Sequence, residues 1–208
     1  MHKPIFSLDM DGTLADSHSR WLEIARERLG IDARLEDLRI YDFWKILGLA
    51  TEQECLDIFA DVWEDYGAIK PLHPRIPEMV DEIRRLYRVC INTACVGDQG
   101  NVKMWLKDNG ISYDLFHFCV DRNDKLKVMP EAHMDDCAEL AEKFLANGSS
   151  TVLISRPWNV GLQHEVCAYR NARVAKDWEE AKDIAMSGDF LRMALAARVP
   201  RGGGGHKA

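Results

Sequence analysis

No apolar run in the sequence is long enough to cross a bilayer, so the sequence does not predict a membrane-spanning protein. The N-terminus also lacks the long apolar region and small-residue cleavage site of a signal peptide, since only His2 and Lys3 separate the first methionine from a strand-like stretch. We therefore expect a soluble, cytoplasmic protein without a membrane partner.

Paired cysteines and excess positive charge are missing as well. The six cysteines form no Cys-x-x-Cys pair and lie scattered in apolar segments, so we expect buried thiols in a reducing compartment instead of disulfides or a zinc site. The formal net charge of -7 leaves no basic surface for a nucleic acid or an anionic membrane. A phosphate ligand would need cations placed locally around it.

Short strand-like apolar runs alternate along the chain with stretches of helical apolar spacing. The 208 residues, 47% of them hydrophobic, suffice for one α/β domain with an insertion. Helical spacing of apolar residues covers 76–87 and 137–145. This alternation predicts a Rossmann-like, three-layer parallel sheet covered on both faces. Strand-like runs occupy 4–9, 88–93, 115–120, a short stretch before Asp135, 151–155 and 172–177.

Residues 16–72 interrupt this rhythm. They carry three helical patterns, at 17–29, 36–48 and 52–66, with no strand between them. We expect a helical cap inserted after the first strand, above the edge of the sheet where such folds bind ligands. The core domain would then comprise residues 1–15 and 73–200, followed by a flexible glycine-rich tail at 201–208.

The stretch DMDGT at residues 9–13 raises the main chemical question. Asp9 and Asp11 stand at the end of an apolar strand, and buried carboxylates so close together are costly unless a cation joins them. Oxygen ligands suit a hard ion such as Mg²⁺. The alternative is an ordinary turn at Asp11 and Gly12.

Three further elements follow later strands in the chain. Thr93 ends the second strand, where its hydroxyl and nearby N–H groups are available to a phosphate oxygen, although threonine is common at strand ends. Lys125 and the pair Asp135-Asp136 come after the third and fourth strands. Taken singly, a solvated lysine and acids that complement a helix dipole are alternatives.

Together, DMDGT, Thr93, Lys125 and Asp135-Asp136 resemble the haloacid dehalogenase superfamily of aspartate-nucleophile phosphohydrolases, over most of residues 4–177. Within it the sequence is most similar to the 5'(3')-deoxyribonucleotidases. The resemblance to that family also rests on Lys103-Met104-Trp105, on Lys125 ten residues before Asp135, and on SRPWN at 155–159.

The sequence departs from the pattern of that family in two places. Ala94 stands where a serine commonly follows the threonine. Pro130 and His133 interrupt the stretch before Asp135, which predicts an edge strand or an irregular strand there.

The resemblance implies a role for each matched residue. Asp9 would be the nucleophile and Asp11 the general acid and base. The metal would be Mg²⁺, bound by Asp9, by the Asp11 carbonyl and by Asp136, with Asp135 close by. Phosphate would be bound by Thr93, Ala94 and Lys125.

The cap would select the substrate. Phe43 and Trp44 are adjacent and cannot both face the core, so they are the candidates for stacking on a nucleobase. The resemblance of Lys103-Met104-Trp105 to the nucleotidase pattern implies that Lys103 also binds substrate. Trp63 lies on a clean helical stripe and is expected in the core.

These features predict an Mg²⁺-dependent phosphomonoesterase whose substrate is a small-molecule nucleoside or deoxynucleoside monophosphate. The alternatives are a phosphatase for another small metabolite, such as a sugar phosphate, and a catalytically silent binding protein of the same fold. The net charge disfavours a nucleic-acid substrate. An amphipathic stretch at 190–199 would either dock on the domain or mediate homodimerisation.

Overall fold

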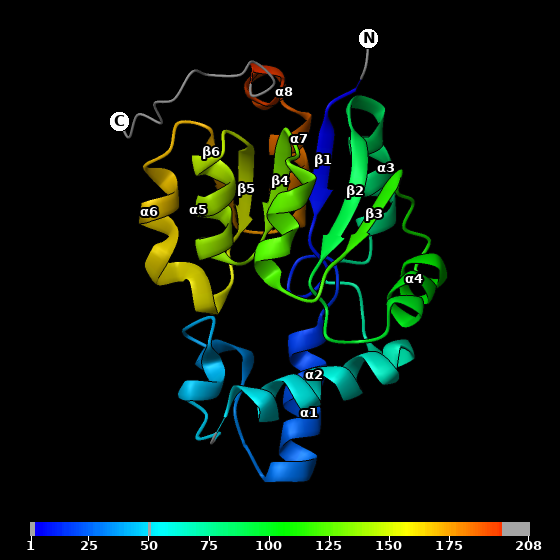
Figure 1. Ribbon diagram of the computed structural model, residues 1–208, viewed down its shortest axis with the longest axis vertical. Helices are drawn as coiled ribbons and strands as arrows, with labels where there is room; N and C mark the ends of the chain where they lie inside the picture. The colour runs from blue at the N-terminus through cyan, green and yellow to red at the C-terminus, as the bar shows by residue number, and fades with distance from the viewer. Residues whose placement is uncertain (1–2, 50, 197–208) are drawn as a thin grey trace.

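The computed structural model describes residues 3–49 and 51–196, which are built around one parallel sheet. Figure 1 shows the strands side by side, and their order is β3-β2-β1-β4-β5-β6. The chain therefore starts in the middle of the sheet, builds outward through β2 and β3, and then returns to the other side of β1. The strands are β1 (Ile5–Leu8), β2 (Arg88–Thr93), β3 (Leu115–Phe118), β4 (Ala132–Asp135), β5 (Ser150–Ile154) and β6 (Ala172–Ala175).

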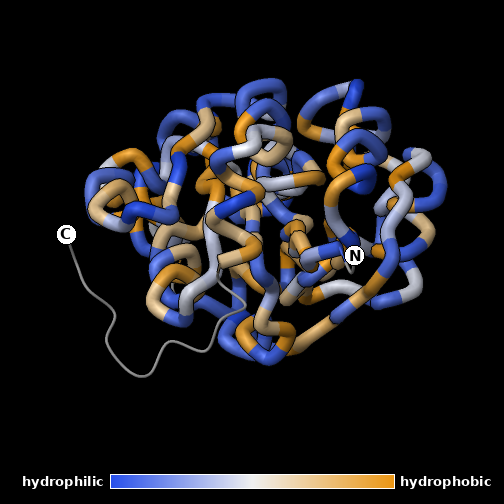
Figure 2. Tube along the Cα trace, turned by 90° about the horizontal axis from the view of Figure 1, so that it is seen from above, coloured by the Kyte–Doolittle hydropathy of each residue, from blue (hydrophilic) through white to orange (hydrophobic). Residues whose placement is uncertain are grey.

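Helices cover both faces of the sheet, which confirms the predicted three-layer α/β fold. Helices α3 (Ile76–Leu86), α7 (Trp178–Met186) and α8 (Gly188–Ala196) pack on one face. Helices α5 (Ala138–Ala146) and α6 (Gln163–Cys167) pack on the other face. Figure 2 shows hydrophilic and hydrophobic residues alternating along the outer coils of the chain, as expected of helices with one face on a sheet.

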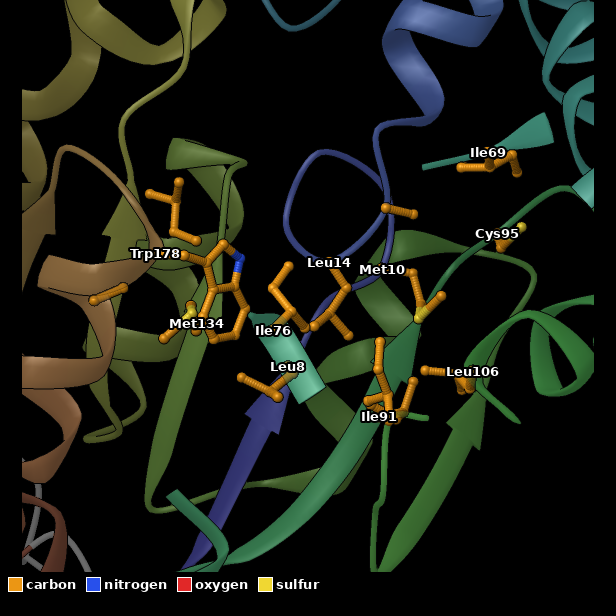
Figure 3. Packing of buried hydrophobic residues seen from close by; sticks show 14 of the residues in the cluster. Leu8, Met10, Leu14, Ile69, Ile76, Ile91, Cys95, Leu106, Met134 and Trp178 are labelled. Atoms are coloured by element: carbon orange, nitrogen blue, oxygen red, sulfur yellow. The ribbon is translucent and has the colours of Figure 1, made fainter. Parts of the chain in front are cut away.

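The core lies between the sheet and these helices. β2 and β5 are buried along almost their whole length, because a parallel strand inside a three-layer fold has no face towards water. In Figure 3 the Trp178 indole lies beside Met134 and Ile76, below the loop that follows β1. The loop that follows β1 therefore rests on packed apolar side chains.

The segment between β1 and β2 forms a helical layer at one end of the sheet. Helices α1 (Ser17–Leu29) and α2 (Glu52–Glu64) pack on each other, and the Trp21 indole donates to the Cys55 carbonyl over 3.0 Å. The arrowheads of β1, β2 and β3 point towards α1 and α2 in Figure 1. Helix α4 (Gln99–Asp108) follows β2 and contacts the end of α2. This layer therefore covers the carboxyl ends of the central strands.

The expectation of a helix at 36–48 is wrong. The structure has only two short 3₁₀ turns there, Leu35–Asp37 and Phe43–Lys45. Phe43 turns inward and packs edge-on against Trp21, with ring centroids 5.0 Å apart. Burial of this aromatic ring between α1 and α2 outweighs the local helical pattern.

The expectation of an edge or irregular strand before Asp135 is also wrong. β4 lies between β1 and β5, and all four of its residues are buried. Pro130 precedes the strand and interrupts no ladder. His133 is tolerated in the interior because both of its ring nitrogens have hydrogen-bond partners.

Three smaller expectations have different outcomes. Five of the six cysteines are buried free thiols as expected, but Cys167 is exposed. Residues 190–196 of the amphipathic stretch expected at 190–199 belong to α8, which packs on α7. Its last residues and the tail at 201–208 lie outside the described residues. None of the helices in the described ranges combines the length and apolar character of a membrane span.

Candidate active site

Three carboxylates meet at the carboxyl ends of β1 and β4. Asp9 follows β1, Asp135 ends β4, and Asp136 comes next in the chain. One oxygen from each of them lies within 4.8 Å of the others, and all three side chains are buried. Because β1 and β4 are parallel neighbours, residues 126 positions apart in the chain reach the same point. The predicted convergence of Asp9 and Asp136 is therefore present.

Lys125 supplies a positive charge to this cluster. Its ammonium lies 2.7 Å from Asp9 Oδ1 and 3.1 Å from Asp135 Oδ2, and the side chain is buried. Burial alone would lower the pKa of Lys125, but Asp135 and Asp9 together raise it above its ordinary value. Lys125 is therefore a permanent cation at the centre of the site.

The three acids have different protonation tendencies. Burial would raise the pKa of Asp135, but Lys125 and His133 lower it below the usual range. Burial raises the pKa of Asp9, although Lys125 opposes the shift. For Asp136, burial and the neighbouring Asp135 raise the pKa to about 7. Lys125 therefore secures the charge of Asp135 but does not compensate all three carboxylates.

The donor set fits a divalent cation. When all three carboxylates are ionised, one ammonium leaves two negative charges, and Arg156 lowers the pKa of Asp136 only as a smaller contribution. All three groups offer oxygen atoms, which hard ions such as Mg²⁺ prefer. The cluster therefore has the charge and the ligand type that Mg²⁺ requires.

Asp136 is oriented by neutral donors. Trp158 Nε1 donates to Asp136 Oδ2 over 2.8 Å, and the Thr13 hydroxyl lies 3.4 Å from Oδ1. The Asn159 amide donates to the Asp136 carbonyl over 2.8 Å. The SRPWN motif indicates this loop but assigns no role to its tryptophan. The indole contact depends on the loop conformation, which the sequence pattern does not specify.

The loop after β1 is held in place by hydrogen bonds from residues that follow β5 and β6. Arg156 Nε donates to the Gly12 carbonyl over 2.8 Å, and the Trp178 indole donates to the Thr13 carbonyl over 2.6 Å. Gly12 has φ of +71°, and a Cβ there would lie 2.4 Å from Asp136 Oδ2. Glycine is therefore required at this position for both conformation and space.

Asp11 is bound by the helical layer. Trp63 of α2 is fully buried, and its indole donates to Asp11 Oδ1 over 3.0 Å. Gly97 lies against it so closely that a Cβ would approach the Trp63 Cβ to 2.2 Å. Burial raises the pKa of Asp11, while Ser17 and Trp63 oppose the shift. Trp63 is a core residue, as the helical stripe predicted, but it also contacts the site.

Thr93 and Ala94 lie at the end of the neighbouring strand. The Thr93 hydroxyl is buried and has no hydrogen-bond partner among the described residues. A buried hydroxyl of this kind is costly unless a ligand satisfies it. Ala94 lines the cavity beside Asp11. Both positions are consistent with the predicted phosphate contacts.

A cavity of about 130 Å³ opens between Asp11 and the helical layer. His18 stacks on Trp158 with ring centroids 4.2 Å apart, and its Nδ1 is buried without a partner among the described residues. Burial lowers the pKa of His18 to about 3, with Arg156 adding to the shift, so the ring is neutral. The other lining residues are Tyr41, Asp42, Phe43, Trp44, Glu52, Cys55, Leu56, Phe59, Ala94 and Val96.

Phe43 and Trp44 line this cavity together, whereas Lys103 does not. The Lys103 ammonium lies 4.8 Å above the Phe116 ring, on the exposed side of α4. Of the predicted site residues, Asp11, Phe43, Trp44 and Ala94 line this cavity. Asp9, Asp135, Asp136 and Lys125 form the buried charged cluster, and Lys103 belongs to neither group.

The tryptophans share a pattern of indole hydrogen bonds. Five of the six donate their indole N–H to an acceptor within the protein. The buried Trp44 Nε1 has no partner in the part of the chain that the structure describes, and Trp44 lines the cavity. Trp44 and His18, which both line the cavity, therefore each carry a buried nitrogen without a partner among the described residues.

Comparisons with known proteins show which fold this is. No family model matches the sequence, and no curated protein matches it. Among solved structures, a haloacid dehalogenase-like hydrolase from Streptococcus pneumoniae matches 86% of this chain and 96% of its own, with a TM-score of 0.60 and 18% identity. At these identities the likeness concerns the fold alone, and this chain has the haloacid dehalogenase-like fold.

Two other structural neighbours are enzymes with different descriptions. YfnB from Bacillus subtilis, described as a HAD-hydrolase bound to magnesium, has a TM-score of 0.57 and 13% identity over 90% of this chain and 100% of its own. The L-2-haloacid dehalogenase PA0810 has a TM-score of 0.51 and 16% identity over 90% of this chain and 100% of its own. The fold therefore does not select one reaction.

Gly12→Ala is expected to disturb the site more than an equivalent glycine replacement elsewhere. Gly30 has φ of +68°, but no atom lies within 4 Å of the place that a Cβ would occupy, so Gly30→Ala isolates the conformational cost of about 1–2 kcal/mol. Gly12→Ala adds the clash with Asp136, about 1–3 kcal/mol more. Urea unfolding of both variants measures the difference. Equal losses would contradict the close approach.

His18 is expected to make stability depend on pH. Its pKa is lowered to about 3 in the folded state, so the unfolded chain binds more protons below pH 6.5. This contribution to stability is present above pH 6.5 and is lost as pH falls, at up to about 1.4 kcal/mol per pH unit. Urea unfolding between pH 5 and pH 7 should show a smaller slope in His18→Phe than in the wild type. The control is His164→Phe, which replaces an exposed histidine and should keep the wild-type slope.

Proposed function

We propose that this protein is an Mg²⁺-dependent phosphomonoesterase that acts through an aspartyl-phosphate on Asp9. The observation that carries the proposal is the buried contact of Asp9 with Lys125, in a cluster where oxygens of Asp9, Asp135 and Asp136 lie within 4.8 Å of one another. Asp11, two residues after Asp9, lines the cavity. Hydrolase neighbours of the same fold support it. A carboxylate nucleophile divides the displacement into two easier steps.

The side chains divide the work between the two steps. In the first, an Asp9 oxygen forms a bond to phosphorus while the ester P–O bond breaks, and Asp11 gives its proton to the leaving alkoxide. In the second, Asp11 takes a proton from water, the water oxygen attacks phosphorus, and the bond to Asp9 breaks. The raised pKa of Asp11 suits a group that must both give and take a proton.

Charge and hydrogen bonding to the phosphoryl group come from other residues. Lys125 neutralises negative charge on Asp9 and on the phosphoryl oxygens, and the unsatisfied Thr93 hydroxyl donates to one of those oxygens. Asp9, Asp136 and the carbonyl of Asp11 would hold Mg²⁺, which supplies positive charge against the transferring phosphoryl group. Positioning and charge stabilisation account for most of the catalysis of this reaction.

The leaving group would occupy the aromatic cavity under residues 16–72, which we propose to be the substrate-selecting cap. Phe43, Trp44 and Phe59 offer rings to a flat group, and the unpaired nitrogens of His18 and Trp44 offer hydrogen bonds. Stacking on such rings contributes about 1–3 kcal/mol per base. A nucleoside or deoxynucleoside monophosphate supplies both the flat ring and the polar edge. A sugar phosphate would leave the rings unused.

Asp9→Asn is expected to abolish phosphate release while the protein stays folded. The assay measures inorganic phosphate from a panel of nucleoside monophosphates and sugar phosphates, with Mg²⁺ or with EDTA. We expect turnover by the wild type only with Mg²⁺, and highest on nucleotides. Unchanged turnover by Asp9→Asn would overturn the mechanism, whereas preference for sugar phosphates would overturn only the substrate assignment.

Trp63→Phe is expected to lower kcat by about tenfold or more, because Asp11 loses a hydrogen bond to a charged group. The ring and its packing against Gly97 are kept. Trp105→Phe is the matched control: this indole packs edge-on against Trp63 and donates to the Ile69 carbonyl, away from Asp11. Steady-state kinetics of both variants should separate them. Equal kcat values would show that the indole contact is only structural.

A further inference from the structure

A chain of buried polar side chains runs through the middle of the sheet and ends on Asp9. Ser7 of β1 and His133 of β4 are opposite each other in the strand register, and Ser7 Oγ lies 2.6 Å from His133 Nδ1. His133 Nε2 lies 3.0 Å from Asp135 Oδ2. The same oxygen binds Lys125, whose ammonium contacts Asp9.

The interior position of this chain needs an explanation. Ser7, His133 and Asp135 have no exposed surface, in two adjacent strands that are otherwise apolar. Burying polar groups costs free energy unless they are hydrogen-bonded, and apolar residues in the same places would avoid that cost. None of these three side chains touches the cavity. These side chains therefore do not contact a ligand in the cavity, and their role must lie in holding another group of the protein.

The geometry shows which group they hold. An Asp135 carboxylate paired with Lys125 can only accept hydrogen bonds, so His133 Nε2 carries the proton that it donates. The backbone N–H of Cys137 donates to the other oxygen, Asp135 Oδ1, over 2.8 Å. Both carboxylate oxygens are thus fixed, and Lys125 meets an acceptor that cannot rotate away.

The other end of Lys125 is fixed as well. Asn92 of β2 donates from its side-chain amide to the Lys125 carbonyl over 3.1 Å. His117 Nδ1 of β3 lies 2.9 Å from the Asn92 side-chain oxygen. The backbone of Lys125 is therefore attached to β2 and β3, while its ammonium is attached through Asp135 to β4 and β1.

We infer that His133, supported by Ser7, is a positioning residue that holds Asp135 so that Lys125 stays against the nucleophile Asp9. In this arrangement Asp135 serves mainly to anchor Lys125, and Asp136 is left as the carboxylate of the pair without an ammonium partner among the residues that the structure describes. The inference rests on the proposed function insofar as it concerns catalysis. Its geometric part stands without that function.

The kinetic test compares three variants. The His133 and Phe144 ring centroids lie 3.8 Å apart, so His133→Phe keeps a ring against Phe144 but removes both hydrogen bonds. We expect kcat of this variant to fall about 10-fold to 100-fold, with a smaller change in KM. His133→Gln retains a donor near the Nε2 position and should recover much of that loss. Ser7→Ala should give an intermediate loss.

The matched control is Thr151→Val. Thr151 is the register partner of His133 on β5, is equally buried, and has a hydroxyl without a partner among the described residues. This variant should keep the wild-type kcat. If His133→Phe also keeps kcat within about twofold while Asp9→Asn abolishes turnover, the inference is overturned and the proposed function stands.

A second measurement does not need a substrate. In a crystal structure of His133→Phe, we expect the Asp135 carboxylate to turn and the Lys125 ammonium to leave Asp9, whereas His133→Gln should keep both contacts. An unchanged pair of Lys125 and Asp9 in His133→Phe would overturn the inference even if the wild type releases no phosphate. Urea unfolding of all variants checks that each one folds.

Discussion

The repulsion among three buried carboxylates is the constraint on which the rest of the structure depends. Asp9, Asp135 and Asp136 lie within 4.8 Å of one another, and Lys125 is the cation that contacts two of them. Such an arrangement is unfavourable unless further positive charge enters it. It persists because rigid elements supply the groups. Two adjacent parallel strands carry the acids at their carboxyl ends, and the 3₁₀ segment Arg122–Val128, which is hydrogen-bonded to β2, carries the lysine.

Neutral donors complete the site without cancelling its charge. Trp158 orients Asp136 and Trp63 orients Asp11, each through an indole N–H. A lysine or arginine in either place would fix the carboxylate equally well but would neutralise it and compete with a metal ion. Indoles fix direction and leave the negative charge available. Two of the six tryptophans in this chain thus have a role beyond packing.

The sequence allowed much of the fold and of the site to be predicted, because those parts depend on local pattern. Strand-like runs that end in polar residues located Asp9, Thr93 and Asp135 at one edge of a parallel sheet. The structural neighbours have the same fold. The local pattern does not predict structure that depends on burial against distant partners. The segment around Phe43 forms a 3₁₀ turn instead of the expected helix, and β4 lies in the middle of the sheet instead of at its edge.

The missed contacts share one cause. Trp63 was expected as a core residue and Trp158 was seen only as part of a loop motif, yet both indoles reach acids of the site. Whether an indole N–H meets a carboxylate depends on the rotation of the ring and on elements far away in the chain. Apolar periodicity reports which face of a helix is buried, but not which atom of a buried ring points at a charge.

The electrostatics also bear on whether this fold is used for binding or for chemistry. A module that only binds a neutral ligand in the aromatic cavity has no use for a buried acid cluster behind it, and apolar replacements of similar volume would be at least as stable. Here Asp11, two residues after Asp9 of the cluster, lines the cavity, and the unsatisfied Thr93 hydroxyl lies at the end of the neighbouring strand. A ligand that brings a phosphoryl group to this edge, together with a divalent ion, would satisfy both the hydroxyl and the excess negative charge. The free-energy cost of burying these acids thus supports the phosphoryl chemistry proposed above independently of the likeness in fold.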